Sequence, residues 1–185
     1  MAHGNVANVS AGKPAIGGAV FWAPLGTTLP TDAVSQLDAA FKSLGYCSED
    51  GATNSNAPST SDIKAWGGDP VLTTQDEKPD RWQVKLIEAL NENVLKAVYG
   101  SDHVTGTLAA GLTVEVDSSE AEEGVWVIDM ILRGDVAHRI VIPRGKITDL
   151  EDINYVDNDV IGYGITITAF PDSAGKTHRK YYKSA

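Results

Sequence analysis

The sequence predicts an α+β fold that is mainly antiparallel β, a sandwich or barrel of about seven or eight strands with one or two flanking helices. Three observations support this class. Several short segments alternate apolar and polar residues, as half-buried strands do. The chain has 18 Gly and 8 Pro among 185 residues, many of them between these segments. Only two segments carry apolar residues at helical spacing.

The first third of the chain is predicted to contain an arm, a strand, a helix and a loop. Residues 1–16 are small and polar and indicate a flexible N-terminal arm. Residues 19–23 form a short apolar strand that stops at a proline. Residues 31–45 are predicted to form an amphipathic helix, whose apolar stripe consists of Val34, Leu37, Phe41 and Leu44. Residues 48–61, rich in Ser, Asn, Thr and Gly, are predicted to form a long loop.

A hairpin followed by a short helix is predicted next. The hairpin tip is expected at about residues 67–80, with Gln75 to Asp80 as its polar end. Residues 82–86 alternate apolar and polar side chains and form its return strand. Asn91 can cap a helix that Gly100 can end in the left-handed conformation.

After residue 100 the chain is predicted to be nearly all strand. The predicted strands cover residues 112–116, 125–132, 137–143 and 160–170. The third is expected to end at a Pro-Arg-Gly-Lys turn, and an acidic connection at residues 149–159 leads to the fourth. The C-terminal tail, about residues 171–185, can add a last short strand through Tyr181 and Tyr182. The length favours one domain over residues 1–185.

The charge distribution argues against nucleic-acid binding. The net charge is −10, so the body has few cations to offer phosphates. The last ten residues are the exception, because they hold four cations and no acid: Lys176, Arg179, Lys180 and Lys183. A single cysteine, Cys47, excludes an intrachain disulfide. No apolar run approaches the roughly 18–20 residues of a membrane span, so no membrane association is expected.

The sequence contains no recognisable catalytic, cofactor or metal motif. Gly175-Lys176-Thr177 lacks the upstream glycine of a phosphate-binding loop, and Gly162-Tyr163-Gly164 lacks the third glycine of a dinucleotide fingerprint. Neither HExxH nor GxSxG is present. We therefore expect no catalytic residue, no cofactor and no metal. A loose calcium site remains an alternative, with oxygen ligands from Asp149, Glu151, Asp152 and Asp157.

The order and spacing of six segments indicate a known family. The segments are GAVFWAPLGTTLP (18–30), LDAAFKSLGY (37–46), SEDG (48–51), IKAWGG (63–68), LIEA (86–89) and NVLKAVYG (93–100). In this order they resemble the major tail proteins, or tail tube subunits, of long-tailed, siphovirus-type bacteriophages, especially phages of actinobacterial hosts. The similarity extends over about residues 17–170.

The resemblance implies a tail-tube fold and a structural, non-enzymatic function. In this family, subunits form hexameric rings that stack into a tube. The tape-measure protein fills the tube during assembly, and DNA passes through it on ejection without specific binding. Other implied partners are the tail terminator and the baseplate or distal tail proteins. The expected location is the virion tail, after assembly in the host cytoplasm.

The resemblance also suggests two groups of contact residues. Because arms and a long loop bridge successive rings in the family, candidates for the contact between rings lie at the hairpin: Trp66, Asp69, Asp76, Glu77 and Asp80. Candidates for the lumen are Glu115 and Asp117, because they share the polar face of a predicted strand.

Two alternatives stay open at this point. The first is a non-enzymatic carbohydrate- or calcium-binding β-sandwich module. It would use Trp66 or Trp82 as a sugar platform and the carboxylates of residues 149–159 as the calcium site. The second is another phage tail component, such as a terminator or a baseplate protein.

Overall fold

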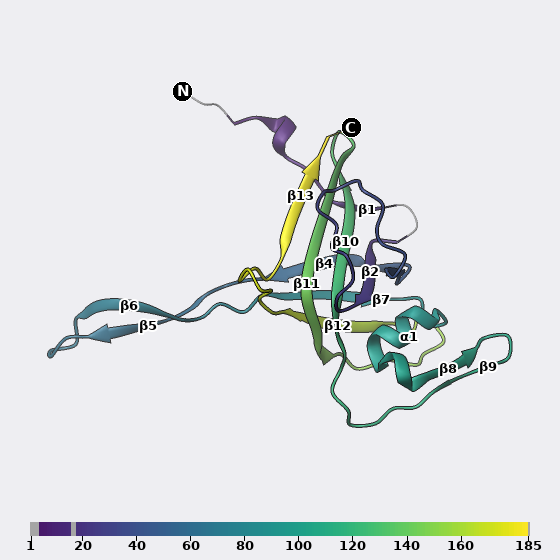
Figure 1. The fold of residues 1–185 in the computed structure, drawn as a ribbon. Coiled ribbons are helices and arrows are strands. Elements are labelled where there is room, and N and C mark those ends of the chain that lie inside the picture. The colour runs from purple at the N-terminus through teal and green to yellow at the C-terminus, as the bar shows by residue number, and fades with distance from the viewer. Residues whose placement is uncertain (1–3, 16–17, 185) are drawn as a thin grey trace.

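The computed structural model describes residues 4–15 and 18–184, and in this part of the chain its main feature is a nine-stranded sheet (Figure 1). The hydrogen-bonded order is β3–β2–β10–β11–β12–β7–β4, with β1 beside β10 and β13 beside β11. All pairings are antiparallel, which confirms the predicted fold class. The strands are β1 (Lys13–Pro14), β2 (Val20–Pro24), β3 (Lys42–Ser43), β4 (Cys47–Ser55), β7 (Arg81–Leu86), β10 (Glu123–Leu132), β11 (Val136–Leu150), β12 (Tyr163–Ala169) and β13 (Arg179–Lys183).

Strand β11 joins the two halves of the sheet. Its first part, Ala137 to Val141, pairs with β13, and its last part, Gly145 to Leu150, pairs with β12. The turn predicted at residues 143–146 is wrong, because the strand continues through them. The register against β10 shifts here, so that Pro143 lies at an irregularity. A proline is tolerated at such a place because its missing N–H is not needed by the ladder.

The core lies on both faces of the sheet. Along β10, Trp126 and Ile128 belong to the larger apolar cluster, whereas Val125 and Val127 belong to the smaller one. This alternation follows from the period of two in a strand. The helix α1 (Glu92–Tyr99) covers the larger cluster with Val94, Leu95 and Val98.

Helix α1 forms as the sequence predicts. The Asn91 side chain accepts a hydrogen bond of 3.0 Å from the backbone N–H of Asn93. Gly100 ends the helix at φ 100°, where its N–H donates to the Lys96 carbonyl oxygen. Both caps satisfy backbone groups that the helix itself leaves unpaired.

The helix predicted at residues 31–45 is wrong. Its four apolar residues do not share one face, because Leu44 packs in the larger cluster, Phe41 packs in the smaller one, and Val34 is exposed. The Asp32 carboxylate instead accepts hydrogen bonds from the N–H groups of Val34 and Ser35. Local side-chain bonds of this kind compete with helix formation.

The long loop predicted at residues 48–61 is also wrong. Strand β4 pairs with β7, and the two chains then leave the body as a second hairpin of β5 (Ser59–Lys64) and β6 (Pro70–Glu77). Figure 1 shows this hairpin projecting far from the sheet. The chain turns at residues 65–69, with Gly67 and Gly68 at positive φ. The tip predicted at residues 67–80 is therefore too long, because most of residues 70–80 belong to β6 or to the base of the hairpin.

The remaining elements are short. Strands β8 (Val104–Thr107) and β9 (Gly111–Val114) pair beside α1, and two 3-10 turns, η1 (Val6–Asn8) and η2 (Ser101–His103), complete the described chain. The N-terminal residues 4–15 run along the end of β10, where the Arg133 guanidinium donates to the Val6 carbonyl oxygen. Strand β13 confirms the short strand predicted through Tyr181 and Tyr182.

Candidate assembly surfaces

The projecting hairpin, β5–β6, has its own internal order. Two side-chain bonds cross it: Ser61 donates to Asp76, and Thr73 donates to Asp62 at 2.7 Å. At the tip, the Ala65 N–H donates to the Asp69 carbonyl oxygen at 2.8 Å. Every residue of β5 and β6 is nevertheless exposed. An isolated two-stranded hairpin is marginally stable in water, so this one gains from a partner.

The hairpin exposes apolar side chains that nothing in the described chain covers. Trp66 at the tip is fully exposed, and Ile63, Val71 and Leu72 on its two strands are each half exposed or more. Ile63 and Leu72 are paired across the two strands, and adjoining exposed apolar side chains of this kind are typical of a contact site for another molecule. This hairpin is therefore the first candidate assembly surface.

The structure separates the five residues that the sequence suggested as contacts between rings. Trp66 and Asp69 lie at the tip, and Asp76 and Glu77 lie at or near the end of β6 closest to the body. Asp80 does not belong with them. Its side chain is only 1% exposed at the base of the hairpin, so its assignment to an exposed contact surface is wrong.

Asp80 instead ties the base of the hairpin to the C-terminal segment. Its carboxylate accepts hydrogen bonds from Asn54 Nδ2 at 2.9 Å, from Thr177 Oγ1 at 2.6 Å and from His178 Nδ1 at 2.5 Å. Burial raises the pKa of the Asp80 carboxyl, but bonds from Thr177, His178, Asn54 and Asn56 outweigh burial and hold the pKa below its usual range. Sequence reasoning missed this cluster because the three donors lie 26 to 98 positions from Asp80.

The two lumen candidates lie beyond the strand that was predicted to carry them. Strand β9 ends at Val114, so Glu115 and Asp117 do not share a strand face as expected. The Glu115 N–H donates to the His103 carbonyl oxygen, and Asp117 lies 3.5 Å from His103 Nε2. Both acids are exposed and lie next to His103 of η2. Their assignment to a lumen stays a prediction.

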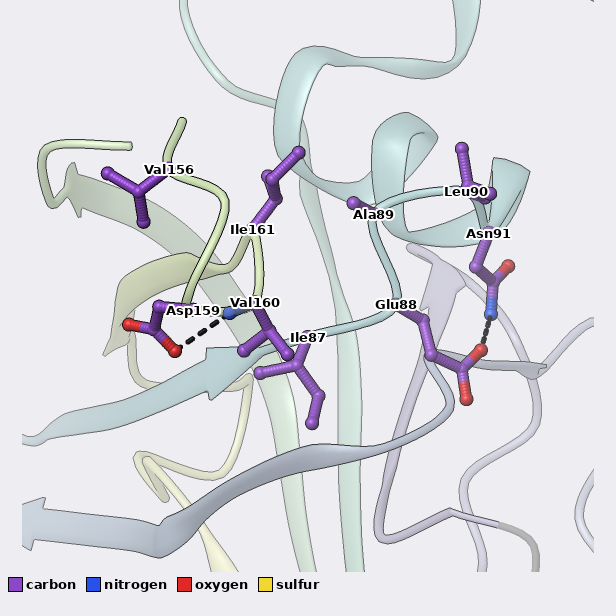
Figure 2. A pocket seen from close by; sticks show the side chains of 9 residues that line it. All are labelled: Ile87, Glu88, Ala89, Leu90, Asn91, Val156, Asp159, Val160 and Ile161. Atoms are coloured by element: carbon purple, nitrogen blue, oxygen red, sulfur yellow. Dashed lines mark hydrogen bonds between the residues drawn. The ribbon is translucent and has the colours of Figure 1, made fainter. Parts of the chain in front are cut away.

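An open groove at the other end of β7 is the second candidate surface. Figure 2 shows residues 87–91, between β7 and α1, opposite Val156 and residues 159–161 of the acidic connection. The groove has a volume of about 710 Å³. On one side, the Glu88 carboxylate fixes the chain by accepting bonds from the Tyr46 N–H and from Asn91 Nδ2. Leu90, Val156 and Val160 line it and are more than half exposed.

The acidic connection shows no arrangement of metal ligands. Within residues 4–15 and 18–184, no group of three or more His, Cys, Asp or Glu side chains could hold a metal ion. The calcium site considered for residues 149–159 gains no support from this geometry. None of the helices in the described residues is long and apolar enough to cross a membrane.

The fold and its surfaces define a class of protein, one that contacts other chains. An antiparallel β domain with a projecting apolar hairpin and an open apolar groove is suited to contacts with other chains. The model of the phage tail tube protein family matches residues 6–184, and the chain belongs to this family. A search of the curated proteins found none that matches it.

The family match confirms the resemblance that the sequence suggested and gives the coarse function. The protein is a structural component of a bacteriophage tail tube, and the family is one of structural virion proteins that self-assemble with other tail components. The siphovirus type and the actinobacterial host stay predictions.

Proposed function

We propose that this chain forms hexameric rings that stack into the tail tube. The tube would hold the tape-measure protein during assembly and would conduct DNA on ejection. The observation that carries this proposal is the β5–β6 hairpin, which projects from the body with Trp66 fully exposed. A hairpin without a partner in its own chain is explained if a neighbouring copy covers it.

The edges of the sheet support a closed ring. Strand β4 is the edge strand at one end of the large sheet, and among the described strands it pairs only with β7. An unpaired strand edge is an aggregation hazard in a monomer, and pairing with neighbouring copies removes it. Closure of a ring would therefore pair the exposed strand edges with neighbouring copies.

The charge supports a conduit that does not retain DNA. The net charge of −10 leaves few cations for phosphate contacts. We propose that exposed carboxylates, with Glu115 and Asp117 as candidates, face the lumen. The hairpin residues Trp66, Asp69, Asp76 and Glu77 are the proposed contacts between rings. The tail terminator and the baseplate or distal tail proteins would cap the two ends of the tube, and assembly would take place in the host cytoplasm.

The proposal is tested by imaging the purified protein at high concentration by negative-stain electron microscopy, together with light scattering. Hollow tubes or rings of one diameter would support it. If the protein alone stays monomeric, a cognate baseplate is added as an initiator. A protein that remains monomeric on the baseplate, and that binds Ca²⁺ or a glycan in calorimetry, would contradict the proposal and favour the binding-module alternative.

A further inference from the structure

We propose that the basic C-terminal strand β13 of one copy docks into the α1 groove of the next copy. The α1 groove is the groove lined by residues 87–91, Val156 and residues 159–161. This inference rests on the self-assembly in the proposed function, and it names a contact that the projecting hairpin does not make. It would link two features that the fold leaves unexplained, the basic C-terminal segment and the acidic connection.

The α1 groove is an apolar surface that lacks a cover. Leu90 is 71% exposed, Val156 is 51% exposed and Val160 is 53% exposed. Tyr155, which directly precedes Val156 in the sequence, is also mostly exposed. Removing such side chains from water contributes about 25 cal/mol per Å² of apolar area, so an occupant with apolar groups of its own stabilises the contact.

Charge limits the choice of occupant. The acidic connection has no Lys or Arg, and its acids are all exposed: Asp149, Glu151, Asp152, Asp157 and Asp159. None of these carboxylates makes an ion pair within the part of the chain that the structure describes. Lys85 is a cation close to this connection, because its side chain passes beside Gly162. The groove therefore favours an occupant that is both basic and partly apolar.

Strand β13 has these properties, and the projecting hairpin does not. Lys180 and Lys183 are exposed on β13, and Tyr182 between them is 60% exposed, with its ring stacked on His138. The hairpin has more acids than bases, so the acidic groove repels it. Its charged residues are Asp62, Lys64, Asp69, Asp76, Glu77 and Lys78.

The two surfaces lie at opposite ends of β11. Strand β13 pairs with Ala137 to Val141 near its start, and the acidic connection follows its end at Leu150. Fifteen residues at about 3.3 Å each span up to roughly 50 Å. Figure 1 shows β13 and α1 at separate ends of the molecule. A contact between these surfaces is therefore head-to-tail, and head-to-tail contacts generate rings or open filaments.

The first test is a cross-link between two single-cysteine variants, Val156→Cys and Tyr182→Cys, assembled from an equal mixture. Cys47 can stay in place, because burial and then the nearby Glu88 carboxylate raise the pKa of its thiol to about 11 and keep it unreactive near neutral pH. The matched control replaces Val156→Cys by Leu108→Cys, which is similarly exposed on the β8–β9 turn. Mild oxidation and non-reducing electrophoresis, with one chain tagged, detect the mixed dimer.

The second test is a charge swap. Asp159→Lys, in the lining of the groove, or Lys180→Glu, on the face of β13 that carries Tyr182, is alone expected to raise the critical concentration for assembly about twofold to fivefold, in the range of one exposed ion pair. The double variant is expected to restore the wild-type value, because the exchanged charges face each other across the contact. Asp102→Lys, an exposed reversal outside the groove, controls for net charge.

The outcomes separate this inference from the proposed function. A mixed dimer in the Val156→Cys and Tyr182→Cys tubes, absent from the Leu108→Cys control, supports the docking. Tubes without that dimer, or a double charge variant no better than the single ones, overturn the docking and leave the proposed function intact. A wild-type protein that never forms rings or tubes, even on a baseplate, overturns both.

Discussion

The carboxylate of Asp80 and the imidazole of His178 are hydrogen-bonded across 98 positions of sequence, Nδ1 to Oδ2 at 2.5 Å. This pair joins the base of the projecting hairpin to the segment that leads into β13. The Trp82 ring stands edge-on to His178, with centroids 5.3 Å apart. The hairpin is therefore held by the C-terminal segment as well as by its own two strands.

Replacing Asp80 by alanine is expected to lower the free energy of unfolding by about 3 kcal/mol, because partly buried donors on Asn54, Thr177 and His178 lose their acceptor. Because the pKa of Asp80 is lower in the folded protein than in the unfolded chain, the stability it contributes is present above about pH 4 and is lost as pH falls through the folded pKa. Urea unfolding from pH 3 to pH 7 measures both effects. Asp80→Asn should flatten this acid dependence, and an unchanged profile would contradict the assignment.

Replacing residues 59–77 by a short Gly-Asn turn is expected to leave the body folded and to abolish tube formation. The deleted residues are exposed and the shorter connection costs less entropy to close, so the free energy of unfolding should not fall and should rise by at most about 2 kcal/mol. Urea unfolding and electron microscopy measure the two properties. As a control, deleting residues 75–80 should destabilise the body, because that cut removes Asp80. Normal tubes from the shorter hairpin would contradict the proposed contact between rings.

Arg139→Ala is expected to destabilise the protein by about 3–5 kcal/mol. The buried guanidinium makes two bonds to Asp129, at 2.7 and 2.8 Å, and also donates to the carbonyl oxygens of Asp32 and Ser35. Its removal leaves the Asp129 carboxylate without its partner. Arg139→Lys should also destabilise, since an ammonium cannot reproduce the two-pronged geometry.

The matched control for that measurement is Arg144→Ala. Arg144 makes a similar paired contact with Glu123, but its side chain is 47% exposed. Exposed ion pairs contribute about 0–1 kcal/mol, so this variant should be nearly neutral in urea unfolding. Equal losses for the two variants would contradict the role given to burial.

His103 is expected to titrate above its ordinary pKa. The main cause is the hydrogen bond from Nδ1 to the Tyr99 carbonyl oxygen near the end of α1, and the carboxylates of Asp117, Asp102 and Glu115 add to it. Because the folded pKa is raised, the stability it contributes is present below about pH 6.5 and is lost as pH rises through the folded value. Proton–carbon NMR of the imidazole measures this, and Asp117→Asn should lower the value. A His103 pKa below 6.5 in the wild type would contradict the contact.

Local patterns predicted the elements whose environment is simple. Helix α1 carries its caps and its apolar stripe within ten positions, and β7 and β12 alternate along their own length, so periodicity was sufficient. The family could also be recognised from the sequence, because the resemblance rests on the order of short segments and not on their contacts in the fold. The match to residues 6–184 confirms that identification.

Elements that depend on distant partners were predicted wrongly. The apolar residues from Val34 to Leu44 have helical spacing, yet the sheet takes Phe41 on one face and Leu44 on the other. The polar residues of β4 and β5 lack any apolar alternation, and pairing with β7 and β6 makes them strands. No local signal distinguishes such strands from a loop.

The sequence by itself determined the mainly β class, the capped helix α1, the acidic body with its basic end, and the family. Only the tertiary structure decided that Asp80 is buried, that most of residues 48–61 form strands that pair with β7 and β6, and that β13 and the α1 groove lie at opposite ends of β11. The physical reason is the range of the interactions involved. Periodicity and capping act over a few residues, whereas strand pairing and buried hydrogen bonds join residues that only the folded chain brings together.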